Sequence, residues 1–504
     1  MEASAVTEPR RHGGRVLAAL LILIALADFL IFNRQPGINL FLLALALMAG
    51  IVITARRYLP HALLAGLGAA VAAAMPLVES PTILGFFFCL FGLSVLSLTG
   101  SGLLPSRLAA LPSLLLRFVL ISPFRFLIAL FRLPGRSDNE NARLRLSQTV
   151  VVWVVPVLSA IVFVALFRSA NPIIEQLLDK IDLAALLKLL DPVRILFWLT
   201  VCGFAWPLLR PRLMRRRKRR IAKAAIVEVS SESALFGRAA ILRSLVIFNL
   251  LFAVQTLLDL TYLWGGAALP DGMTHASYAH RGAYPLIATA LLAAVFVLCA
   301  IRPNRAGDRD RLIRALVYLW IGQNILLCIS AVFRLDLYVD TYALTELRVA
   351  AGIWMMLVAI GLALILLRIL LDRSNAWLIG MNLAVLTVVL YGSAFVDFPA
   401  VIARFNVEYS LELSGEGTPL DLDYLCDLGS TTIPALDLYI DSVESPWRTK
   451  KLHAMDLRFW MAYQFENRPR DWRSWNYRDD RIDTYIAERR RAPSPPSDSD
   501  GHRL

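Results

Sequence analysis

Residues 347–370 read LRVAAGIWMMLVAIGLALILLRIL, an apolar run whose two charged side chains, Arg348 and Arg368, stand near its ends. As an α-helix, a run of this length covers the ~30 Å of hydrocarbon in a bilayer. The sequence therefore predicts an all-α fold, a polytopic transmembrane helix bundle of about 11 spans with a small, mostly helical C-terminal soluble domain. The other ten apolar runs occupy residues 16–32, 38–54, 60–78, 82–99, 147–167, 193–210, 240–263, 283–301, 312–333 and 376–396.

The composition agrees with solvation by lipid. Of 504 residues, 57% are hydrophobic and 18% are charged, whereas soluble domains are about 45–50% apolar. The net charge of +13 could indicate nucleic-acid binding, but the basic residues flank the apolar runs. Their placement predicts topology and attraction of anionic lipids to the basic loops, and no nucleic-acid partner.

The distribution of Lys and Arg predicts the orientation, because cytoplasmic loops carry the excess. With a cytoplasmic N-terminus, the cytoplasmic segments hold 30 of these residues and the opposite segments hold 8. An odd number of spans then places the chain from about residue 398 outside. The predicted location is a bacterial cytoplasmic (inner) membrane, multi-pass, with a cytoplasmic N-terminus and a periplasmic C-terminal domain.

The predicted orientation of all later spans depends on whether residues 101–136 cross the membrane. Arg107, Arg117, Arg125 and Arg132 stand there among leucines and phenylalanines, which favours helices lying on the membrane surface. If the segment crossed the membrane, everything after it would be inverted. The predicted organisation is a cytoplasmic N-terminus (1–15), N-terminal transmembrane helices (16–100), an interfacial amphipathic basic segment (101–146), a transmembrane pair with an amphipathic outer loop (147–210), a basic cytoplasmic loop (211–239), a transmembrane core (240–397), a C-terminal soluble helical domain (398–491) and a disordered tail (492–504).

From residue 398 onward the sequence is no longer mainly apolar. Residues 398–504 hold 14 basic and 18 acidic residues together with many aromatic ones. The sequence Thr418-Pro419-Leu420-Asp421 has an N-cap residue followed by proline and then an acid, which predicts a helix that starts at Thr418. Apolar faces around Pro434 and along residues 452–465 predict further helices.

Several stretches between residues 240 and 480 carry a family resemblance. The most distinctive is RLDLYVDTYALTELRVAAGIWMM, residues 334–356. This part of the chain resembles an uncharacterised bacterial multi-pass membrane family, domain of unknown function 4173, which is related to 4153. The resemblance implies a multi-pass membrane protein with a polar C-terminal segment, and it implies no substrate, cofactor or catalytic residue. The other matching stretches are SYAHRG (277–282), QN (323–324), NAW (375–377), DYL (423–425), PAL (434–436) and DWRSWN (471–476).

Charged and tyrosine side chains gather after the apolar run 312–333, in a predicted loop and the start of the next helix. Two interpretations remain open, a structural staple that holds the loop to neighbouring helices and a ligand or proton site. The residues of this candidate polar cluster are Arg334, Asp336, Tyr338, Asp340, Tyr342, Glu346 and Arg348.

A second candidate lies in the predicted outer loop 264–282. His275 and His280 are five residues apart and so lack the i, i+4 spacing of a helical metal pair. An interfacial anchor with a pH-responsive histidine is favoured over a zinc site. The candidate residues of this loop are His275, Tyr278, His280 and Arg281.

Polar side chains also fall inside two apolar runs, 240–263 and 312–333. Such residues are costly in lipid unless they are paired, so they should face other helices or a wet cavity. Hydrogen bonds between helices and a transport pathway are both possible. The residues are Asn249, Gln255, Asp259, Gln323 and Asn324.

The sequence contains no familiar catalytic signature. It has no phosphate-binding loop, no H-E-x-x-H helix, no G-x-S-x-G elbow and no CxxC pair. We therefore expect no catalytic residue, cofactor or metal, and favour a non-enzymatic membrane protein that senses, binds or helps assemble an envelope component, with an envelope protein or lipid as partner. The alternatives are a transporter that uses the polar residues above, and an enzyme acting on lipid-linked substrates with Asp336, Asp340 or Glu346 as base.

Overall fold

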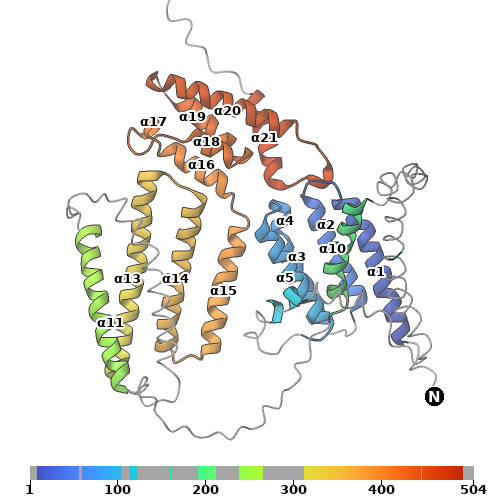
Figure 1. The fold of residues 1–504 in the computed structure, drawn as a ribbon, viewed down its shortest axis with the longest axis horizontal. Helices are drawn as coiled ribbons and strands as arrows, with labels where there is room; N and C mark the ends of the chain where they lie inside the picture. Colours follow the sequence, from blue (N-terminus) through green and yellow to red (C-terminus); the bar gives the residue numbers. More distant parts are fainter. Residues whose placement is uncertain are drawn as a thin grey trace, which may run out of the picture. The chain divides into compact units, whose positions relative to one another are not determined.

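The structure, a computed structural model, describes residues 8–55, 60–103, 114–116, 118–121, 159, 191–211, 238–264, 311–443 and 445–491. Within these ranges every regular element is a helix, and eight helices are long and apolar enough to cross a membrane. The chain divides into two compact units (Figure 1). One is Met1–Arg215 with Arg470–Tyr477, and the other is Arg216–Pro469 with Arg478–Leu504.

The first unit is a bundle of apolar helices. The tightest pair is α3 with α5, where a Cβ on Gly92 would lie 2.6 Å from the Cβ of Ala73. Small residues let membrane helices approach this closely. The elements are α1 (Glu8–Ile31), α2 (Ile38–Thr54), α3 (Pro60–Ala74), α4 (Pro76–Glu79), α5 (Ile83–Gly100) and α10 (Pro192–Leu209).

Residues 470–477, which include η7 (Trp472–Ser474), pack in this first unit against the turn between α1 and α2. The backbone N–H of Ile38 donates to the carbonyl of Trp475 over 2.7 Å. Arg473 donates to the carbonyl of Phe29 and lies 4.1 Å from the centre of its ring. The DWRSWN motif therefore makes a cation–π contact with α1 through Arg473 and Phe29.

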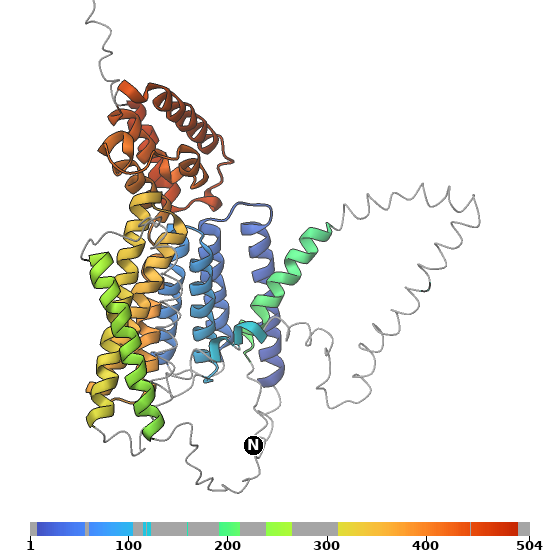
Figure 2. The same cartoon turned by 60° about the vertical axis from the view of Figure 1, so that its left-hand side comes forward.

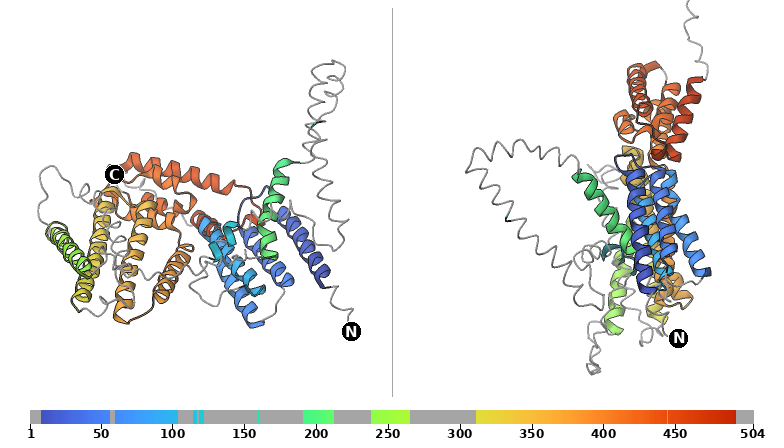
Figure 3. Two further views of the ribbon diagram at one scale, coloured as in Figure 1. Left: turned by 60° about the horizontal axis from the view of Figure 1, so that its bottom comes forward. Right: turned by 90° about the vertical axis from the view of Figure 1, so that its right-hand side faces the viewer.

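Four long helices stand in a row in the second unit (Figures 1, 2 and 3), and neighbours in the row pack against each other. They are α11 (Arg238–Asp259), which continues as the π-helix η3 (Leu260–Trp264), α13 (Arg311–Tyr342), α14 (Glu346–Leu370) and α15 (Asn375–Ser393). The side chain of Ser374 starts α15 by accepting the N–H of Trp377.

Shorter helices follow α15 and pack around a core of their own, which we call the C-terminal helix cluster. Leu425, Ile433, Leu436 and Tyr439 are fully buried in this core. Figure 1 shows the cluster beside the ends of α13 and α15. The elements are α16 (Phe398–Glu408), α17 (Leu411–Ser414), α18 (Leu422–Asp427), η5 (Ser430–Thr432), α19 (Ile433–Ser442), η6 (Ser445–Trp447), α20 (Arg448–Glu466) and α21 (Tyr477–Arg491).

Two sequence expectations are corrected by these helix bounds. The run 312–333 does not end before a loop, because α13 continues to Tyr342 and places Arg334 inside a helix. The helix expected from Thr418 begins at Leu422 instead, since the Asp421 side chain accepts the N–H of Tyr424 and is the actual N-cap. Thr418 instead donates its hydroxyl to the carbonyl of Thr341.

The predicted spans can be compared only where the structure describes them. Nine of the eleven coincide with helices, although α2 is shorter than the other apolar helices that could cross a membrane. The spans 147–167 and 283–301 lie outside the described residues, as do most of segment 101–136, the basic loop, the outer loop and the tail 492–504.

Candidate functional site

The candidate polar cluster predicted at residues 334–348 is divided by the structure. Arg334 is buried and pairs with Asp259 of α11. Asp336 and Asp340 are exposed on α13, and Glu346 is exposed in the first turn of α14. The remaining three residues, Tyr338, Tyr342 and Arg348, lie together where α13 turns into α14.

At this turn Arg348 covers the end of α13. Its guanidinium donates to the carbonyls of Tyr342 and Ala343 and lies 4.5 Å from the centre of the Tyr338 ring. The last carbonyls of a helix have no partner within the helix, so Arg348 supplies the donors they need. Ala343 has a φ of +61°, a conformation that a residue with a side chain rarely adopts.

The C-terminal helix cluster is bonded to the same turn. Asn406 of α16 accepts from the N–H of Leu344 at 2.7 Å and donates to its carbonyl at 2.9 Å. Tyr424 accepts from the N–H of Glu346 over 3.2 Å. Together with Arg348 and the bond from Thr418 to Thr341, these contacts form what we call the hairpin joint, a set of bonds that ties the turn between α13 and α14 to the C-terminal helix cluster.

The five intramembrane polar residues lie on α11 and α13. Gln323 donates to the carbonyl of Asn249 at 3.3 Å, and Asn249 donates to the carbonyl of Leu316 at 3.1 Å. Asn324 instead bonds within its own helix, to the carbonyl of Trp320. The helices run parallel, since Asn249 faces Gln323 and Asp259 faces Arg334.

Asp259 and Arg334 form the most buried ion pair among the described residues, with side chains 1% and 3% exposed. Gln255 also donates to Asp259, over 3.0 Å. The π-helix η3 begins directly after Asp259. We call these contacts between α11 and α13 the interhelical seam; the pairing of its polar groups with each other is the arrangement that lipid-embedded helices require.

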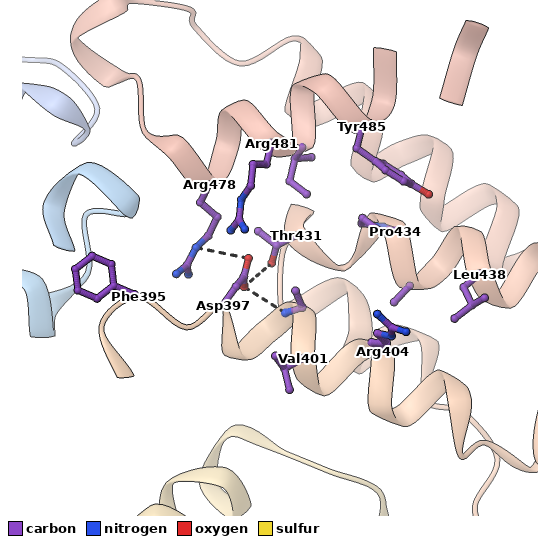
Figure 4. A pocket seen from close by; sticks show the side chains of 13 residues that line it. Phe395, Asp397, Val401, Arg404, Thr431, Pro434, Leu438, Arg478, Arg481 and Tyr485 are labelled. Atoms are coloured by element: carbon purple, nitrogen blue, oxygen red, sulfur yellow. Dashed lines mark hydrogen bonds and ion pairs between the residues drawn. The ribbon is translucent and has the colours of Figure 1, made fainter. Parts of the chain in front are cut away.

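Sequence reasoning missed a pocket at the membrane end of the C-terminal helix cluster, which we call the edge pocket (Figure 4). It has a volume of about 660 Å³, within the range of small-molecule sites. It begins two residues after α15 ends. The lining residues are Phe395, Asp397, Ala400, Val401, Arg404, Thr431, Pro434, Ala435, Leu438, Arg478, Arg481, Ile482 and Tyr485.

The edge pocket combines apolar walls with positive charge. Its lining contains three arginines and one acid, Asp397. Phe395, Val401 and Leu438 remain 37%, 51% and 37% exposed. Exposed apolar side chains beside charged groups are typical of a surface that binds an amphiphilic molecule.

Asp397 organises one end of the pocket. Its carboxylate accepts the N–H of Ala400 and the hydroxyl of Thr431, each at 3.2 Å, and lies 3.5 Å from Nε of Arg478. Arg478 also donates to the carbonyl of Val396. Figure 4 shows Arg478 and Arg481 extending from α21 toward Asp397, so the start of α16 holds the guanidinium of Arg478 in place.

The other ionisable groups of the pocket are held in one charge state. Hydrogen bonding and attraction from Glu408 raise the pKa of Arg404 above its ordinary value. Burial, with a further effect of Asp437, raises the pKa of Tyr485 to about 12. Near neutral pH the pocket therefore presents fixed guanidinium cations and a protonated tyrosine.

No single motif in the sequence marks this site. Arg404, Thr431 and Arg478 come from three separate stretches, and only the spacing of Arg478 and Arg481, three residues apart on one helix, is visible locally. His275, Tyr278, His280 and Arg281 lie outside the described residues. In the part of the chain that the structure describes, no group of His, Cys, Asp and Glu side chains has a metal-binding arrangement.

In the part of the chain that the structure describes, eight long apolar helices indicate a helical membrane protein. The chain belongs to the family described as Domain of unknown function (DUF4153), whose model matches residues 62–439. This agrees with the predicted relation to 4153, while the closer resemblance to 4173 stays a prediction. No curated protein and no solved structure matches the chain. The match includes α16 and most of α19 and ends before Arg478 and Arg481.

Proposed function

We propose that this chain is a non-enzymatic, multi-pass protein of a bacterial inner membrane that binds a component of the cell envelope. The C-terminal helix cluster carries the binding site, and the hairpin joint fixes that cluster to the membrane helices. The single observation behind the proposal is the edge pocket, whose lining contains three arginines, exposed apolar side chains and one acid.

The proposed orientation rests on charge. The excess of Lys and Arg in alternate segments favours a cytoplasmic N-terminus. With an odd number of spans, the ends of α13 and α15 and the C-terminal helix cluster belong to the periplasmic face. The envelope component would then meet the edge pocket from the periplasm.

Binding is favoured over catalysis by the chemistry of the lining. An arginine stays protonated in proteins and is a poor acid or base. Tyr485 keeps its proton near neutral pH, and Asp397 already accepts from Ala400 and Thr431. The pocket thus holds charge in place, while a general acid or base must exchange a proton near the operating pH.

The two alternatives have weaker support. Of the polar residues proposed for a transport pathway, Asn249, Gln323 and Asp259 bond across the interhelical seam. The acids proposed for an enzyme, Asp336, Asp340 and Glu346, are exposed and are not among the residues that line the edge pocket.

Photo-cross-linking in intact cells tests the proposal. A benzoylphenylalanine at Val401 or Leu438 should form an adduct with the bound component. Leu452 of α20 is the matched control, because it is 54% exposed where Val401 is 51% exposed, and it lies outside the pocket. The same adduct pattern at all three positions, or no adduct at Val401 and Leu438, would contradict the proposed function.

A further inference from the structure

The edge pocket lies where a lipid headgroup would be. Helix α15 is a candidate membrane span, Asn375–Ser393, and only Leu378 of its residues is buried. A helix that is apolar on nearly all sides and so little covered is solvated by lipid. Phe395 and Val396 follow at 37% and 41% exposure, so the mouth of the pocket is next to the boundary between hydrocarbon and water.

The charges of the pocket select an anion. Guanidinium groups are planar forks of N–H donors that match the paired oxygens of a phosphate. Arg478 is oriented by Asp397 and by the carbonyl of Val396, and a guanidinium has five donors, so it can hold these partners and a phosphate oxygen together. Arg481 reaches toward the same end of the pocket (Figure 4), and Arg404 stands on α16.

The apolar walls indicate what is attached to that anion. A free phosphate would leave most of the volume and the exposed surfaces of Val401 and Leu438 without a partner. A phosphodiester that carries glycerol and acyl chains would cover them, and its chains would continue beside α15. Covering this apolar surface is itself favourable.

Building on the proposed function, we propose that the edge pocket binds the phosphodiester headgroup of an anionic phospholipid through Arg478, Arg481 and Arg404, with the first part of its acyl chains on Phe395, Val401 and Leu438. The lipid is the envelope component recognised by the C-terminal helix cluster.

The test uses the full-length chain in nanodiscs that contain phosphatidylglycerol and phosphatidylcholine in equal parts. Lipid that remains bound after extraction is identified by native mass spectrometry. The variant Arg404→Gln/Arg481→Gln removes two pocket charges and keeps Arg478, which is bonded to Asp397. The control Arg490→Gln/Arg491→Gln removes the same charge from exposed positions of α21 outside the pocket.

We expect wild type and control to retain phosphatidylglycerol in preference to phosphatidylcholine. The pocket variant should lose roughly five-fold in affinity for each arginine, about twenty-five-fold in all. Equal retention of the two lipids, or equal behaviour of pocket variant and control, would overturn the lipid assignment. Displacement of the lipid by inorganic phosphate at similar concentration would show that free phosphate is the ligand, which also overturns it.

The cross-linking experiment separates this inference from the proposed function. An adduct at Val401 that contains an acidic peptide instead of a lipid would overturn the lipid inference and leave the binding function standing. Absence of any adduct at both pocket positions would remove both. A lipid adduct at Val401 and Leu438, absent at Leu452, supports both together.

Discussion

In the hairpin joint, Arg348 bonds to the carbonyls that end α13 and stacks on Tyr338, while in the edge pocket Arg404 and Arg481 stand beside exposed apolar walls. Both regions contain arginine and tyrosine side chains. In the first, the cation satisfies backbone carbonyls and covers a ring, and in the second three arginines and one acid are among the residues that line a cavity. Composition alone does not separate a structural contact from a binding surface; the local balance of charge and the presence of a cavity do.

The interhelical seam contains the most buried ion pair among the described residues. Breaking this pair should have the largest effect on stability of all the variants. Replacing Asp259 by Leu leaves the buried Arg334 without its carboxylate, which costs about 3–5 kcal/mol of stability. The double variant Asp259→Leu/Arg334→Leu should recover most of this loss, because an apolar pair is acceptable in a membrane interior. Thermal unfolding in detergent measures both.

The control for this seam prediction is Asp336→Ala, on the same helix as Arg334 but exposed. It should leave the unfolding midpoint close to that of wild type. If Asp259→Leu were as stable as the control, the seam would not be a structural element, and a transport pathway along α11 and α13 would become the better interpretation.

Two tyrosines of the C-terminal helix cluster predict a loss of stability in alkali. Burial raises the pKa of Tyr485 and of Tyr439 to about 12, whereas an unfolded tyrosine titrates near 10. Below pH 10 both states keep the proton. Between about pH 10 and pH 12 the unfolded state loses it first, so stability falls with rising pH, by up to about 2.7 kcal/mol for each tyrosine.

The measurement compares slopes rather than absolute stabilities, because Tyr485→Phe also removes the hydrogen bond to Asp437. Unfolding midpoints between pH 10 and pH 12 should fall less steeply in Tyr485→Phe than in wild type, and Tyr439→Phe should show the same change. An unchanged slope in both variants would mean that these side chains ionise equally easily in the folded and unfolded chain.

The hairpin joint predicts a smaller and more local effect. Asn406→Ala removes both bonds to Leu344 and should cost about 1–3 kcal/mol, because a backbone donor and acceptor lose their partner. Hydrogen exchange of the peptide 341–348 should become faster. Asn467→Ala is the control, since exposed Asn467 bonds only to the carbonyl of Tyr463 four residues before it; equal exchange in the two variants would argue against a joint.

The helices of this chain could be predicted because lipid imposes one condition on each span, a long apolar run. The residues at which the helices begin and end were harder to predict. Helix α13 passes through Arg334 and Asp340 to Tyr342, since the buried Arg334 has a partner on α11 that the local sequence does not show. Thr418 was expected to be an N-cap because its sequence fits one, but its hydroxyl bonds to Thr341, 77 residues away.

The edge pocket was harder to predict from the sequence because it depends on contacts between residues that are far apart in the chain. The cluster at residues 334–348 was visible because its charges are neighbours in the chain. The edge pocket exists only after α16, α19 and α21 pack together, and two of its arginines follow the end of the family match at residue 439. Contacts over such distances in sequence leave no local pattern to read.

The last prediction returns to the two sets of arginines. Arg348→Gln should lower stability by roughly 1–2 kcal/mol, because it removes donors to helix-end carbonyls and a cation–π contact. Arg404→Gln/Arg481→Gln changes exposed side chains and should leave the unfolding midpoint of lipid-free protein unchanged. Added phosphatidylglycerol should raise the unfolding midpoint of Arg348→Gln but raise that of the pocket variant only a little. The reason is that a ligand stabilises the folded protein only by binding to it. If both variants gained equally, the arginines of the pocket would be ordinary surface charges, and the difference between the two regions would vanish.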